Sequence, residues 1–147
     1  MATLQQILLT PENQPHVVGD CLTLIDQEVS SKSGVSGTAV KLAYKIANTF
    51  ASGYVRGMVE KLVPEMVVKL EAFWADFTAS GAGDFGDYLV KHGDEVSEAL
   101  LSVTDEHASV STRSTILKAY RAVRGGASKH VTAALPALGA LVQKYAG

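Results

Sequence analysis

The residues best suited to metal binding or acid–base chemistry lie in an acidic stretch of the sequence. His92 is followed by an Asp-Glu pair at 94–95, and residues 105–107 read Asp-Glu-His. Imidazole and carboxylate groups can hold divalent ions, but none of the four histidines has a second histidine at metal-ligand spacing. A di-iron bundle would need Glu-x-x-His on two helices, and neither copy is present. We therefore expect no metal, no cofactor and no catalytic residue. An enzyme built on this stretch stays a lesser alternative, because a helical cleft can assemble a site that no linear motif reveals.

Composition narrows the class of protein further. The chain has 147 residues, of which 47% are hydrophobic and 19% charged, and its net charge is -2. These values predict one domain with a substantial core and exclude a disordered chain. The single cysteine, Cys21, excludes a disulfide framework and a cysteine-clustered metal site. We expect a cytoplasmic protein without a transmembrane segment, because residues 1–9 contain no basic residue and the longest apolar run covers only residues 131–142.

Helical periodicity recurs along the chain, whereas strand patterns are nearly absent. The sequence therefore predicts an all-α fold, an irregular bundle of seven to eight helices joined by short loops, with residues 1–147 forming a single domain. Capping residues and helix breakers place several helix ends. Ser36, Asp84 and Asp94 are expected N-caps, and the pair Gly125-Gly126 is expected to end a helix. Pro64 is expected to kink the longest helix or to break it into two pieces.

The segment Tyr54–Phe77 is the most apolar part of the chain. Its apolar residues cover more than half of the helical circumference, which predicts burial on several sides. A packed core is the simplest interpretation, but flexible Met side chains beside aromatic rings also suit a pocket for an apolar small molecule or a homodimer surface. The candidate ligand-binding residues are Met58, Met66, Phe73, Trp74 and Phe77.

Charge is distributed unevenly along the chain. Residues 1–106 hold all 15 acidic residues, whereas residues 107–147 hold six basic residues and no acid. One interpretation is that acidic and basic helices adjacent in sequence pack together and neutralise each other, as sequence neighbours usually do. The other is a surface for an acidic partner. Nucleic acid fits less well, because Tyr120 is the one aromatic residue in the basic segment. The candidate partner-binding residues are Arg113, Lys118, Arg121, Arg124 and Lys129.

Three stretches of the sequence together resemble a known family. They are residues 3–37 (TLQQILLTPENQPHVVGDCLTLIDQEVSSKSGVSG), 83–105 (GDFGDYLVKHGDEVSEALLSVTD) and 134–146 (ALPALGALVQKYA). The chain resembles a small family of uncharacterised actinobacterial helical proteins, a domain of unknown function. The resemblance covers nearly the whole chain and implies a stand-alone helical domain, but it implies no activity and no site.

The sequence thus favours a non-enzymatic binding protein. We expect it to bind an apolar small molecule, or to self-associate, through the segment Tyr54–Phe77. The alternative is an adaptor whose basic segment, Arg113–Lys129, docks an acidic protein, a nucleic acid or an anionic lipid surface.

Overall fold

The computed structural model describes residues 3–31, 34–50, 53–81 and 83–146, without the side chains of 34–36, 39 and 47–50. Within these ranges the chain forms eight helices and no strand, so the expected all-α fold is confirmed. The helices are α1 (Leu4–Leu8), α2 (Gln14–Ser31), α3 (Gly34–Phe50), α4 (Tyr54–Ser80), α5 (Phe85–Lys91), α6 (Gly93–Ser109), α7 (Ser114–Arg124) and α8 (Ala127–Ala146).

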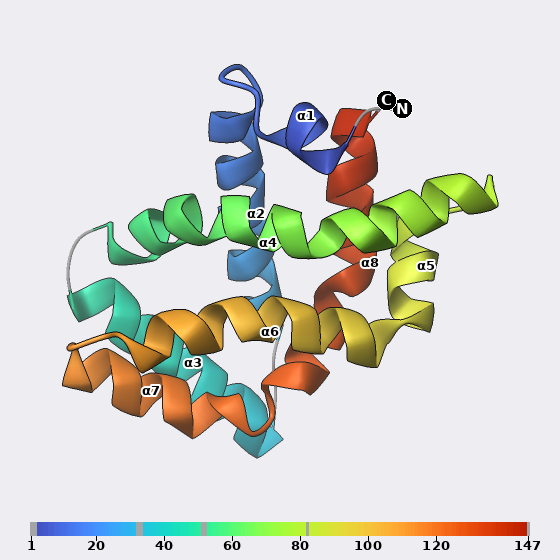
Figure 1. Ribbon diagram of the computed structural model, residues 1–147. Coiled ribbons are helices and arrows are strands. Elements are labelled where there is room, and N and C mark those ends of the chain that lie inside the picture. The colour runs from blue at the N-terminus through green and yellow to red at the C-terminus, as the bar shows by residue number, and fades with distance from the viewer. Residues whose placement is uncertain (1–2, 32–33, 51–52, 82, 147) are drawn as a thin grey trace.

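The helices form two crossed layers with an additional pair at one end. Figure 1 shows α4 and α6 side by side, crossing over α2 and α8. The short helix α5 packs against α8, and α1 packs against α4 close to the C-terminal end of α8. The remaining two helices, α3 and α7, contact each other more than they contact the rest of the bundle.

Two of the expected helix ends are confirmed, and two are wrong. The Asp84 side chain caps α5 by accepting a hydrogen bond from the Asp87 amide, and α7 ends at Gly125 as expected. The N-cap of α6 is His92 rather than Asp94, because α5 and α6 share this residue as C-cap and N-cap. Asp94 lies in the first turn of α6 instead, where its negative charge interacts favourably with the positive end of the helix dipole. Helix α3 starts at Gly34, so Ser36 lies inside it rather than at its N-cap.

Of the two outcomes expected at Pro64, a kink or a break, the break is wrong, because α4 runs without interruption from Tyr54 to Ser80. A proline inside a helix costs about 3 kcal/mol. The buried face of α4 continues on both sides of it, with Val59 and Val63 before the proline and Val67 and Leu70 after it. Burial of each such side chain stabilises the fold by about 1.5–3 kcal/mol, which outweighs the cost of the proline.

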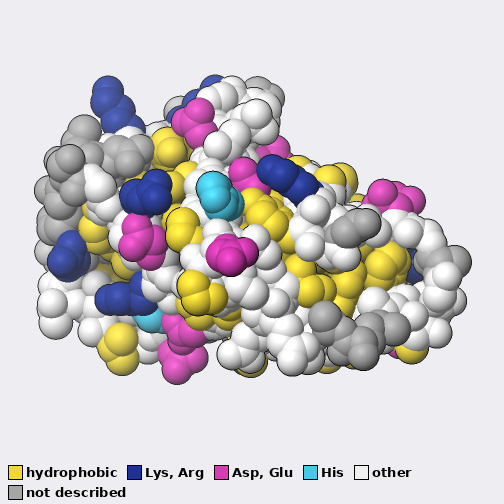
Figure 2. All heavy atoms as spheres, turned by 90° about the horizontal axis from the view of Figure 1, so that it is seen from above, with side chains coloured by type: hydrophobic (Ala, Val, Ile, Leu, Met, Phe, Trp, Pro, Cys, Tyr) yellow, Lys and Arg dark blue, Asp and Glu magenta, His cyan; other side chains and the backbone are white. Residues whose placement is uncertain are grey.

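The uneven charge of the sequence is partly neutralised by pairing between helices. Arg124 pairs with Glu98 and Asp105 of α6, and Lys144 of α8 pairs with Asp20 of α2. On the face seen in Figure 2, basic and acidic side chains are interspersed and hydrophobic ones lie between them. The interpretation that adjacent acidic and basic helices neutralise each other is therefore confirmed for Arg124.

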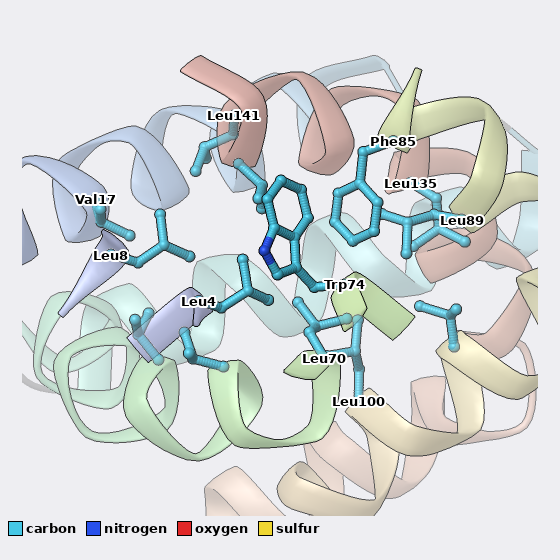
Figure 3. Close-up of a cluster of buried hydrophobic side chains, with 14 of the residues drawn as sticks. Leu4, Leu8, Val17, Leu70, Trp74, Phe85, Leu89, Leu100, Leu135 and Leu141 are labelled. Atoms are coloured by element: carbon cyan, nitrogen blue, oxygen red, sulfur yellow. The ribbon is translucent and has the colours of Figure 1, made fainter. Parts of the chain in front are cut away.

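The core is centred on the single tryptophan of the chain. The Trp74 ring contacts Phe85 edge-on, with the ring centroids 5.0 Å apart, and Phe77 lies 5.6 Å away. Figure 3 shows the indole between Leu4 of α1 and Phe85 of α5. Six helices contribute buried hydrophobic side chains to this cluster, namely α1, α2, α4, α5, α6 and α8. Among the described side chains, α3 and α7 contribute none.

Two glycines allow α5 and α8 to pack closely. A Cβ on Gly139 would lie only 2.3 Å from the Cα of Gly86, so a larger residue at position 139 would push the two helices apart. The amide of Phe85 also donates to Oε1 of Gln143 on α8 at 3.0 Å. These contacts fix α5, and with it Phe85, against the core.

Candidate ligand-binding groove

A groove with a volume of about 710 Å³ lies between the first half of α4, the C-terminal end of α6 and α7. This volume is within the range of small-molecule sites in proteins. Met58 and Leu62 of α4 line one wall, and Ile116 and Leu117 of α7 line the other. The groove therefore lies where the pair α3 and α7 meets the main bundle, away from the core around Trp74.

The sequence of α7 explains the apolar wall of the groove. The helix is strongly amphipathic, yet none of its residues is buried. Its apolar residues Ile116, Leu117 and Tyr120 are only half-buried, and all three line the groove. An apolar helix face normally packs against the core, so this one is only partly covered.

A polar cluster holds α7 in place beside α6. Arg124 donates to Asp105 through Nε at 2.8 Å and Nη2 at 3.0 Å, and the Tyr120 hydroxyl donates to the same carboxylate. The hydroxyl of Thr104 lies 2.7 Å from that of Tyr120. The hydrogen bonds from Arg124 and then Tyr120 hold the pKa of Asp105 below its usual value. Burial, and then the Asp105 carboxylate, raises the pKa of Tyr120. The cluster thus fixes one wall of the groove.

The groove is lined by positively charged groups. Lys61 of α4 and Arg113, which precedes α7, both line it, and the described lining residues include no Asp or Glu. The guanidinium carbon of Arg113 lies 5.3 Å from the centre of the Tyr54 ring. His107 also lines the groove, and its Nε2 lies 2.5 Å from Oε2 of Glu65, which is outside the lining. The N-terminus of α7 opens nearby with no acidic residue in its first turn, so its dipole adds to the positive field.

The five candidate ligand-binding residues lie in two different environments. Met58 lines the groove. Trp74 and Phe77 are buried in the core, and Met66 and Phe73 are half-buried against it. The structure therefore brings four of the five to the core and only Met58 to the groove.

The five candidate partner-binding residues are not gathered at one place either. Arg113 lies at the groove and Arg124 in the cluster with Asp105. Lys118 and Arg121 are exposed on α7, and Lys129 is exposed at the start of α8.

The sequence did not indicate that Lys61, Leu62 and His107 share a site. The apolar stripe of α7 was the available clue, because a short amphipathic helix needs a partner for its apolar face. That partner is set by tertiary packing of α4 and α6, which no local spacing encodes.

The residues singled out for chemistry form no metal centre. Within the described residues, no group of three or more His, Cys, Asp or Glu side chains is placed to hold an ion. Burial raises the pKa of the Cys21 thiol to about 11, so the reactive thiolate is disfavoured there. In the described part of the chain, no helix has both the length and the apolar character needed to cross a membrane.

Comparison with known proteins places this chain in a family but gives it no activity. Residues 4–146 match the family of unknown function DUF6918, and the chain belongs to that family. No curated protein matches the chain. No solved structure matches it.

Proposed function

We propose that this protein is a binding protein that holds an amphipathic small molecule in the groove between α4, α6 and α7. The observation that carries the proposal is the partial burial of α7, whose apolar residues Ile116 and Leu117 face the groove rather than the core. An apolar chain bound there would remove this surface from water, which is favourable by about 25 cal/mol per Å².

Binding is favoured over catalysis because three of the titratable groups at or beside the groove are bound to carboxylates. Tyr120 and Arg124 bind Asp105, and His107 binds Glu65. These contacts hold the walls together and position no nucleophile beside a base. The apolar residues Met58 and Leu62 supply contact area instead.

The uncharged dye Nile red, which fluoresces strongly in apolar surroundings, tests this proposal. We expect the protein to bind it, and we expect Met58→Lys to weaken the binding at least about tenfold, because a charge in an apolar site is costly. Val68→Lys is the matched control, since Val68 lies on the same helix, is 61% exposed and does not line the groove. Circular dichroism checks that both variants remain helical. Absence of dye binding, or equal loss in both variants, would refute the proposal.

Native mass spectrometry of protein purified from its own host separates the proposal from self-association. Mass retained beyond the 15.5 kDa chain would support a bound ligand. A dimer without added mass would instead favour self-association.

The basic face of α7 supports a second proposal, that of an adaptor for an acidic partner. Lys118 and Arg121 are exposed three residues apart, and the helix contains no acidic residue. Binding to a polyanion such as heparin should then weaken steeply with added salt, and Lys118→Gln should reduce it. No binding at low salt would exclude this function.

A further inference from the structure

The charges around the groove indicate the chemical class of its ligand, an inference that rests on the proposed function. We infer that the ligand is an aliphatic chain with a negatively charged head group, a carboxylate or a phosphate, and that Lys61 and Arg113 bind this head group. The apolar wall residues Met58 and Leu117 would contact the chain.

The positions of the two cations along α4 support this assignment. Arg113 lies over the ring of Tyr54, at the start of α4. Lys61 follows Tyr54 by two helical turns, which is about 10 Å at 1.5 Å per residue. Met58 lies between them on the same helix and lines the same groove. Lys61 and Arg113 thus both line the groove, with an apolar surface between them.

Two acidic residues that neighbour groove-lining residues are paired with bases. Glu60 bonds to Arg56 at 3.2 Å, and Glu65 bonds to His107. Among the described residues, Lys61 forms no ion pair. None of the described residues that line the groove is acidic. The chain has 15 acidic residues against 13 basic ones, so a lining with cations and no acid differs from its average surface. Opposite charge attracts an anionic head, whereas a cationic head would be repelled.

Four ligands with the same ten-carbon chain test the inference by displacing Nile red from the wild-type protein. They are decanoate, decyl phosphate, decanol and decyltrimethylammonium. We expect at least one of the two anions to bind about tenfold more tightly than decanol, and the cation to bind more weakly than decanol. Comparison of decanoate with decyl phosphate identifies the head group.

Substitution of the cations tests their role directly. Lys61→Gln and Arg113→Gln should each reduce binding of the preferred anion several-fold and leave decanol binding unchanged. Lys69→Gln is the control, because Lys69 is exposed on the same helix and does not line the groove. If Nile red binds but the anions bind no better than decanol, or the two variants bind the anion as the wild type does, the inference is wrong and the proposed function stands. If neither Nile red nor any of the four ligands binds, both are wrong.

Discussion

Arg124 of α7 binds the carboxylate of Asp105 on α6 through two parallel hydrogen bonds of 2.8 and 3.0 Å. Such bidentate pairs fix orientation as well as distance. Tyr120 donates to the same carboxylate and lines the groove. This one carboxylate therefore joins α7, which forms one wall of the groove, to α6.

Replacing that carboxylate should loosen α7 selectively. In Asp105→Asn we expect faster amide hydrogen exchange in α7, a lower melting temperature and weaker Nile red binding. Glu106→Gln is a matched control, because Glu106 is the next residue and is exposed. If the two variants exchanged amide hydrogens at equal rates in α7, the cluster would have no role in holding the helix.

Acid should destabilise the protein partly through the same group. Hydrogen bonds from Arg124 and Tyr120 lower the pKa of Asp105, so its contribution to stability is present above the unfolded value of about 3.9. That contribution is lost as the pH falls below this value and through the lower folded pKa. Urea unfolding between about pH 6 and pH 3 should show a smaller loss of stability in Asp105→Asn than in the wild type. An identical pH dependence would contradict the assignment.

Alkaline pH should destabilise the protein partly by breaking the hydrogen bond between Tyr145 and Asp20. Burial, followed by the hydrogen bond to Asp20, raises the pKa of Tyr145 to about 12. Its contribution to stability is therefore present below the unfolded value of about 10 and is lost as the pH rises from about 10 to 12. Tyr145→Phe should remove one late-ionising phenol from the ultraviolet titration of the folded protein. The account fails if the number of phenols that ionise near pH 12 is unchanged.

The close approach of α5 and α8 gives a test of the packing. Gly139→Ala should destabilise the protein by about 1–3 kcal/mol in urea unfolding, because the new methyl group would overlap the backbone of Gly86. Gly19→Ala on α2 meets no atom within 4 Å and should be neutral or up to about 1 kcal/mol more stable. Equal stability of the two variants would show that α5 and α8 do not approach each other closely at Gly86 and Gly139.

Trp74 distinguishes a core residue from a ligand-binding one. Trp74→Ala should cost about 3–5 kcal/mol of folding free energy, because the indole fills the centre of the core. Trp74→Phe should cost less, since the buried indole nitrogen has no hydrogen-bond partner among the described residues. A stable Trp74→Ala variant that lost only ligand binding would place the site at Trp74 instead.

The sequence predicted the helices well because apolar spacing and capping are local properties. Asp84 caps α5 through its side-chain carboxylate, and Gly125 ends α7. Pro64 does not break α4, because buried valines on both sides of it hold the helix together. The site was predicted only in part. Periodicity identifies Met58 and Trp74 equally as apolar, and only the packing of α6 and α7 separates a groove from a core.

Methyl NMR of the methionines tests the central claim most directly. Met58 lines the groove and Met66 packs against the core, both on α4, so one sample contains the probe and its control. On titration with uncharged decanol, the account predicts that the Met58 methyl resonance shifts with saturation while that of Met66 stays in place. A saturable shift of Met66 alone, or no shift of either, would contradict a ligand-binding groove between α4, α6 and α7.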